Sequence, residues 1–173
     1  MGGLNKGYVL QDNFKKSCEK QDIFFYRFKD SPTSYNKTEN TSFTVSNICD
    51  CMLFEEGYLI LVELKSNKTK SKPFSKHDLK QLNSINSILQ NKDGCFRERV
   101  VGGFLIEFRE IEKAYFFETK NLLNYFLNNS TKTLNIHKYL KNNICIEIPR
   151  HILRKNYRYD VKYLIKKIKE RDG

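Results

Sequence analysis

The sequence predicts an α/β fold in which helices flank a central mixed β-sheet. The runs 48–54 and 58–65 are apolar on both faces, as expected of strands in the middle of a sheet that helices cover. Other segments, such as 79–89, repeat apolar residues at helical spacing. With 173 residues, 39% of them hydrophobic, the chain is long enough for one continuous core, so we expect a single domain over 1–173.

The N-terminal part is expected to form a short helix, a strand and a long polar excursion. Apolar residues recur at every fourth position from Leu10 to Cys18, which predicts an amphipathic helix over 8–19. Residues 23–26 are typical of a strand. The excursion, 29–47, is rich in Ser, Thr and Asn. Such a loop in a compact domain is usually functional or mobile, and a plain disordered loop is the alternative.

The two apolar runs come next, joined by a turn for which Gly57 is suited. A basic loop, 66–73, follows them. Ser75 resembles the N-cap of the next helix, and Asp78 stands three residues later, as in a capping box. The apolar stripe of this helix extends to Leu89.

Beyond residue 99 the patterns predict another strand pair and then weaker elements. The strands are expected over 100–108 and 114–117. Helices are expected at 119–127, 134–141 and 160–170, with a short strand at 144–148.

Charge gives the first indication of function. The chain has 31 Lys and Arg residues against 20 Asp and Glu, a net charge of +11, which favours a polyanionic partner such as nucleic acid. The alternative is a lysine-rich coding bias whose surplus charge serves only solubility.

No apolar run approaches the length of a membrane span, and the N-terminus has no apolar stretch typical of a signal peptide. We therefore expect a cytoplasmic protein with no membrane partner. Five cysteines without metal-ligand spacing are expected to be reduced thiols; they are Cys18, Cys49, Cys51, Cys95 and Cys145.

Three charged residues interrupt the apolar strands. Asp50 lies in the first run, and Glu63 and Lys65 close the second, where alternation directs both to one face. Buried carboxylates need compensation, and Mg²⁺, for which Mn²⁺ is expected to substitute, prefers such oxygen ligands. The metal would activate a water, while Lys65 would position it or stabilise the developing charge. The alternative is a chance Glu-x-Lys on an exposed strand.

Several sequence segments around these residues follow one another in an order that is a more specific signal than Glu-x-Lys alone. In this order they resemble the RecU family of Holliday junction resolvases, also described as penicillin-binding-protein-related factor A, within the PD-(D/E)xK nuclease superfamily. The resemblance covers roughly residues 7–120 and is carried by 47–50, 62–66, 72–74, 81–82, 102–106 and 114–117.

The resemblance implies a PD-(D/E)xK restriction-endonuclease-like core. It also implies that Asp50 and Glu63 bind the metal, that Lys65 is catalytic, and that Gln81 assists at the metal or the phosphate. The alternative for Gln81 is a polar residue on the solvated side of its helix.

The chain departs from the family pattern in the first helix, where a glutamate usually faces the metal. Gln11 stands at that position, and Asp12 follows it. Gln11 would supply a carbonyl oxygen without charge, and Asp12 would replace it if the register differs by one. A weakened site is the remaining alternative.

The resemblance further implies a homodimer that acts on branched DNA, and a stalk at the place of 29–47, where Tyr35 and Phe43 would stack on bases. Contacts to DNA are expected from the basic residues behind the active site, Lys68, Lys70, Lys72 and Lys76. A second basic cluster near the C-terminus, which is alternatively a solvated face, comprises Arg150, Arg154, Lys155, Arg158, Lys166 and Lys167.

We therefore expect a Mg²⁺-dependent, structure-selective endonuclease that resolves four-way DNA junctions by paired phosphodiester hydrolysis. One alternative is a nuclease of the same fold with another DNA substrate. Another is a branched-DNA-binding protein that does not cut, which Gln11 favours and the retained acidic pair disfavours. A basic scaffold protein would explain the charge but not the buried acids.

Overall fold

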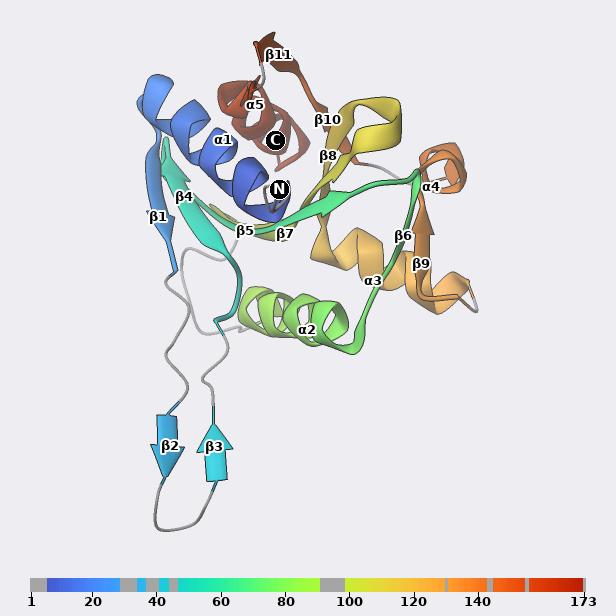
Figure 1. Ribbon diagram of the computed structural model, residues 1–173. Coiled ribbons are helices and arrows are strands. Elements are labelled where there is room, and N and C mark those ends of the chain that lie inside the picture. The colour runs from blue at the N-terminus through green and yellow to red at the C-terminus, as the bar shows by residue number, and fades with distance from the viewer. Residues whose placement is uncertain are drawn as a thin grey trace, which may run out of the picture.

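The computed structural model describes residues 6–28, 34–36, 41–43, 47–90, 99–129, 131–142, 145–154 and 156–172, with the backbone alone for 34–36, 41–43 and 172. Its centre is a mixed six-stranded sheet (Figure 1). The strand order is β1 (Phe24–Arg27), β4 (Cys51–Glu55), β5 (Tyr58–Asn67), β7 (Val100–Phe108), β8 (Lys113–Glu118) and β10 (Ile146–Ile148).

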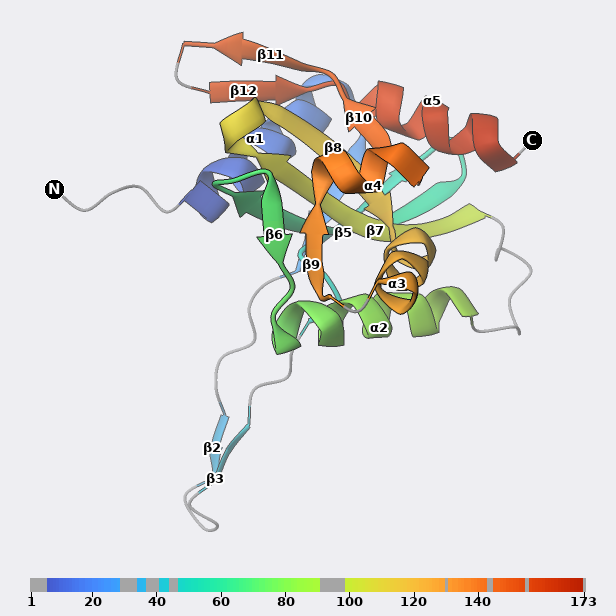
Figure 2. The same cartoon turned by 90° about the vertical axis from the view of Figure 1, so that its right-hand side faces the viewer.

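The central pair, β5 and β7, is parallel, and the other neighbours are antiparallel. Helices cover both faces of the sheet (Figures 1 and 2). One face packs against α1 (Lys6–Lys20) and α5 (Val161–Asp172). The other packs against α2 (Lys76–Gln90), α3 (Thr119–Asn128) and α4 (Ile136–Asn142). The predicted fold class is thus confirmed.

The alternation along β5 decides what each face receives. Val62 and Leu64 enter the core beneath α1 and α5, and Leu61 enters the core beneath α2. Glu63 and Lys65 share the face of Leu61, so they point toward α2.

The turn between β4 and β5 has the two residues expected of a tight hairpin. Glu56 and Gly57 lie between the paired Glu55 and Tyr58, and both have positive φ, 48° and 82°. Two left-handed residues in a two-residue loop match the right-handed twist of the strands, and glycine adopts this conformation without a steric cost.

The strand expected at 48–54 begins later, at Cys51, and residues 48–50 are bends. The reason lies in Asp50, whose Oδ2 accepts the backbone N–H of Leu64 at 2.8 Å. The Asp50 side chain thus accepts the N–H of Leu64 that a backbone carbonyl of a longer β4 would have accepted. Asp50 is therefore held beside β5 at the point where the ladder stops.

The segment 66–73, expected to be a loop, contains the last residues of β5 and a further strand. This strand, β6 (Ser71–Pro73), pairs with β9 (Thr133–Asn135). The partner lies about sixty residues later in the chain, so no local pattern indicates the pair. A short 3₁₀ turn, η2 (Arg109–Ile111), connects β7 and β8.

After β10 the chain forms a hairpin that the sequence patterns do not predict. It consists of β11 (Arg150–Leu153) and β12 (Asn156–Tyr159), and it leads into α5. The predicted strand near 144–148 and the helices near 119–127, 134–141 and 160–170 are present with shifted ends.

The polar excursion is described only in part. Two short strands, β2 (Ser34–Asn36) and β3 (Thr41–Phe43), pair antiparallel, with Tyr35 opposite Ser42. In both views this pair lies apart from the six-stranded sheet (Figures 1 and 2). The rest of the expected stalk and the side chains of Tyr35 and Phe43 lie outside the described residues.

None of the helices in the described ranges is both long and apolar enough to span a membrane.

Candidate active site

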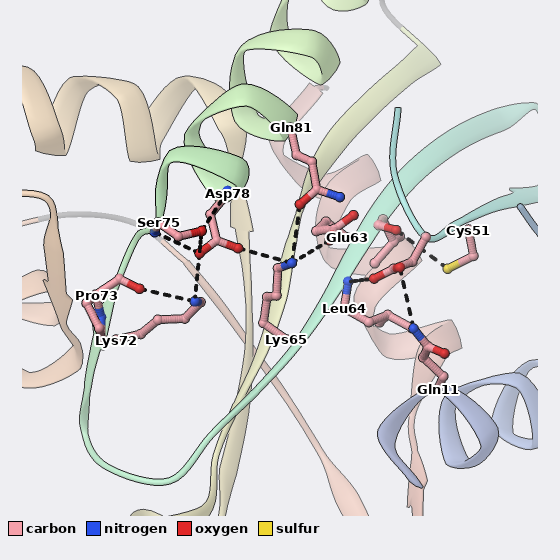
Figure 3. A network of polar contacts seen from close by, with 12 residues as sticks. Gln11, Cys51, Glu63, Leu64, Lys65, Lys72, Pro73, Ser75, Asp78 and Gln81 are labelled. Carbon is pink, nitrogen blue, oxygen red and sulfur yellow. Dashed lines mark hydrogen bonds and ion pairs between the residues drawn. The ribbon is translucent and has the colours of Figure 1, made fainter. Parts of the chain in front are cut away.

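The structure brings Asp50, Glu63 and Lys65 together at the carboxyl-terminal part of β5 (Figure 3). Asp50 is half-buried, and besides Leu64 its carboxylate contacts Gln11, whose Nε2 lies 3.4 Å from Oδ1. α1 thus reaches the site through Gln11, and β4 and β5 reach it through the two acids.

Glu63 is 1% exposed, and only one of its carboxylate oxygens is paired. Oε1 lies 2.7 Å from Lys65 Nζ, whereas Oε2 is buried without a hydrogen-bond partner. Burial, and then the nearby charge of Asp50, raise the pKa of Glu63 from 4.5 to about 7, while Lys65 and the side chain of Gln81 act in the opposite direction. The site therefore holds a carboxylate whose ionised form is poorly stabilised by the protein alone.

Lys65 is held by three acceptors. Its Nζ lies 2.7 Å from Glu63, 3.0 Å from Asp78 Oδ1 and 3.2 Å from Gln81 Oε1 (Figure 3). Burial alone would lower the pKa of Lys65, but the two carboxylates outweigh it and the pKa lies above 10.5. Lys65 is thus a positioned cation rather than a proton acceptor.

Asp78 connects this cation to the start of α2. The predicted capping box is confirmed, because Asp78 Oδ2 accepts the N–H of Ser75 at 2.9 Å and Ser75 Oγ accepts the N–H of Asp78 at 3.1 Å. Despite its burial, the N–H of Ser75 and the cations Lys65 and Lys72 lower the pKa of Asp78 to about 2. Asp78 therefore stays ionised and keeps Lys65 charged.

The role of Asp78 beside Lys65 was not predicted from the sequence. The available signal was its spacing, three residues before Gln81, which puts both side chains on one face of a helix. Gln81 itself is 8% exposed and accepts from Lys65, so its interpretation as a solvated residue is wrong.

The donor atoms fit a hard divalent cation. Two buried oxygens lack hydrogen-bond partners: Oε2 of the Glu63 carboxylate, and the amide oxygen Oε1 of Gln11, which adds to the carboxylates of Asp50 and Glu63. Such oxygens are costly to bury and are ligands of the kind that Mg²⁺ and Mn²⁺ accept. In the described ranges no three His, Cys, Asp or Glu side chains gather as a metal site, so Gln11 would complete a set of only two acids.

The register of α1 selects Gln11 and not Asp12. Leu10 and Phe14 form the buried stripe of the helix, and Gln11 lies beside them, half-buried. Asp12 points to the exposed side and pairs with Lys16 at 2.8 Å. The structure thus does not bring the expected alternative ligand to the site.

The lysines expected to contact DNA differ in their surroundings. Lys68, Lys70 and Lys76 are exposed. Lys72 instead lies 3.1 Å from Asp78 Oδ2, donates to the carbonyl of Pro73 and sits over the ring of Phe74. Its ammonium is thus used within the protein.

The described cysteines are free thiols, as expected; they are Cys18, Cys49, Cys51 and Cys145. Cys49 and Cys51 flank Asp50, and burial, followed for Cys49 by the charge of Glu63, raises the pKa of Cys49 to about 12. Burial likewise raises the pKa of Cys51 well above 9.0. These thiols stay protonated, so they are poor nucleophiles and metal ligands.

Comparisons with known proteins bear on the fold of the chain. No family model matches the chain. The SPbeta prophage-derived uncharacterized protein YotM of Bacillus subtilis (strain 168) is 37% identical over 126 residues, 72% of this chain. The chain spans about 62% of the length of that relative.

A solved structure, Hjc of Archaeoglobus fulgidus, a Holliday junction resolvase from an archaeal hyperthermophile, has the same fold with a TM-score of 0.52. The match covers 80% of this chain and 94% of that one at 11% identity. This likeness concerns the fold alone, and it agrees with the expected α/β core of a central mixed sheet flanked by helices.

The raised pKa of Glu63 makes a prediction about stability without metal. The native state favours the neutral acid, so this contribution is complete below pH 4.5 and is lost as pH rises through about 7. Glu63→Gln stays neutral, so at pH 8 in EDTA we expect it to be more stable than wild type by roughly 2–3 kcal/mol, a gap that shrinks toward pH 4.5.

Urea denaturation at both pH values measures this difference. Asp12→Asn, which changes an exposed acid of α1, is the control and should show no such pH-dependent gain. If Glu63→Gln is less stable than wild type at pH 8, the ion pair with Lys65 outweighs burial and the account of Glu63 is wrong.

Proposed function

We propose that the protein is a metal-dependent nuclease, and more narrowly a RecU-type Holliday junction resolvase that cuts phosphodiester bonds in four-way DNA. The observation that carries this proposal is the buried Glu63, which has one oxygen without a partner, beside Asp50 and the cation Lys65. A purely structural ion pair would leave no such oxygen unpaired, because an unsatisfied buried carboxylate is costly.

Three residues would hold a divalent cation, Asp50 and Glu63 through carboxylate oxygens and Gln11 through its amide oxygen. When bound, Mg²⁺ or Mn²⁺ would neutralise charge on the scissile phosphate and make a water more acidic. The N–H of Leu64 fixes Asp50 in place, so the acid does not have to reorganise to take up a cation.

Lys65 would stabilise the negative charge that develops on the phosphate oxygens. Its side chain is partly exposed, whereas Glu63 lies behind it, so a substrate reaches the ammonium first. Asp78 and Gln81 would keep the ammonium oriented while Glu63 binds the metal. A lysine so anchored acts as a preorganised cation and not as a general base.

The substrate class rests on separate observations. The net charge of +11 and the exposed Lys68, Lys70 and Lys76 suit a phosphate backbone. The likeness to the fold of a resolvase and the β2–β3 pair that lies apart from the sheet support branched DNA. Paired cuts on opposing strands require two active sites, so we propose a homodimer.

Cleavage of a synthetic four-way junction tests the proposed function. With Mg²⁺ or Mn²⁺ we expect paired nicks, and EDTA should abolish them. The rate of nicking should fall by about 100-fold or more in Asp50→Asn and in Lys65→Ala. Asp12→Asn is the matched control, since it removes an acid one residue from Gln11 but outside the site. Equal cutting by wild type and Asp50→Asn would contradict the proposal, and cutting of linear duplex alone would assign another DNA substrate.

The neutral Gln11 favours one further candidate function, a branched-DNA-binding protein that does not cut. Two carboxylates and an amide hold a cation less strongly than three carboxylates would. Gln11→Glu restores the acid at the observed contact with Asp50. For a functional nuclease we expect a lower Mn²⁺ requirement in this variant, with cleavage already present in wild type.

The same titration identifies the non-cleaving protein. Junction binding by wild type without any nicks, and nicks that appear only in Gln11→Glu, would assign the protein to that class.

A further inference from the structure

The β11–β12 hairpin presents a basic and apolar surface that the active site does not use. Its ten residues, 150–159, contain four Lys and Arg, one His and no acidic residue. Ile152 is 64% exposed and Leu153 is 46% exposed, although both are large aliphatic side chains. Exposed aliphatic residues among positive charges are typical of surfaces that contact both the phosphates and the bases of nucleic acid.

The base of the hairpin is fixed to β7, the strand that pairs with β5 and so lies beside the site. Arg150 Nη1 lies 3.0 Å from Glu107 Oε1, and Tyr159 Oη donates to the same oxygen at 3.2 Å. The other oxygen of Glu107 accepts from Ser66, the residue after Lys65, at 3.1 Å. Arg150 also lies over the ring of Tyr157, 4.0 Å from its centroid. Arg150 was expected in the second basic cluster, but its side chain is only 9% exposed and anchors the hairpin to Glu107.

The second anchor joins the hairpin to α1. Ser17 Oγ accepts the N–H of Tyr159 at 3.0 Å, and Gln21 Nε2 donates to the carbonyl of Tyr159 at 2.7 Å. The inner end of the hairpin is thus buried and hydrogen-bonded on two sides. Its outer end, from His151 to Arg154, is exposed.

The hairpin also lies at the same end of the sheet as the active site. Glu107 pairs with Ser66 in the parallel register of β7 and β5, one residue beyond Lys65. Figure 2 shows β11 and β12 extending to the side on which β5 passes into β6 and α1 begins. A DNA arm leaving the site on this side would run along the hairpin.

The turn of the hairpin retains a basic residue where glycine would be easier to accommodate. Leu153 pairs with Asn156, and the two residues between them are Arg154 and Lys155. Arg154 has a φ of +57°, a left-handed conformation that favours glycine or asparagine in such turns. Glu56 has the same conformation in the β4–β5 turn, so what distinguishes Arg154 is its exposed positive charge at the tip of the hairpin.

We propose that the β11–β12 hairpin is a second DNA-binding arm, which grips one duplex arm of a branched substrate next to the active site. Arg154, Arg158 and His151 would contact phosphates, and Leu153, on the same face of the hairpin as His151 and Arg158, would contact sugars and bases where the branch leaves them unstacked. This inference rests on the proposed function, because it assigns the arm to the DNA that the site would cut.

Binding of a labelled four-way junction, measured in Ca²⁺ over a range of salt concentrations, tests the arm with folded variants. Arg154→Gly relieves the turn, so its melting temperature should equal or exceed that of wild type, while junction affinity falls roughly 5- to 20-fold and the salt dependence loses about one phosphate contact. Leu153→Ser should weaken junction binding by a similar factor without changing the salt dependence. Lys120→Ala, at an exposed lysine at the opposite end of the sheet, is the matched control.

The results separate this inference from the proposed function. If wild type binds the junction and neither hairpin variant binds it more weakly than Lys120→Ala does, the hairpin is not a DNA-binding arm. The nuclease proposal would then stay intact. A wild-type protein that does not prefer the junction over linear duplex would overturn the substrate assignment and the arm together.

Discussion

Glu63 lies on a central strand of the sheet, almost fully buried, and the protein supplies a partner for only one of its two carboxylate oxygens. An ionised carboxylate in such surroundings must be compensated, and here compensation is divided between a cationic side chain and an open position. Lys65 fills the first role from the same strand, two residues away, because alternate residues share a face. The second oxygen of Glu63, whose carboxylate lies near that of Asp50, is the position that we assign to a divalent cation.

The surrounding fold keeps this arrangement rigid by using the same residues for structure and for the site. Asp50 ends the β4–β5 ladder by taking the N–H of Leu64, and this contact also fixes its carboxylate. Asp78 caps α2 through Ser75 and at the same time holds Lys65. Any movement of α2 along the sheet would therefore release the ammonium of Lys65. Any shift in the register of β4 would move the carboxylate of Asp50 out of the site.

The sequence was sufficient to predict the convergence of these groups, because it depends on local geometry. Alternation directs Glu63 and Lys65 to one face, and the short turn at Gly57 returns Asp50 to their side. The choice between Gln11 and Asp12 could not be predicted, because it depends on how α1 rotates against the sheet.

Pairings between distant segments were equally hidden. β6 is a lysine-containing strand whose partner β9 lies far along the chain, and the charges of β11 and β12 mask their alternation. The buried role of Arg150 depends on Glu107, more than forty positions earlier in the sequence. Such contacts follow from tertiary packing, whereas composition indicates only that the region is basic.

An anomalous difference map from crystals soaked in Mn²⁺ would show whether the unpaired oxygen of Glu63 binds a metal. We expect a Mn²⁺ peak bounded by Asp50, Glu63 Oε2 and Gln11 Oε1 in wild type, and its loss in Asp50→Asn. A Mn²⁺ peak only at other acidic residues would contradict the assignment of the buried oxygen of Glu63 to a metal. The absence of any peak, with Glu63 still paired to Lys65, would contradict it as well.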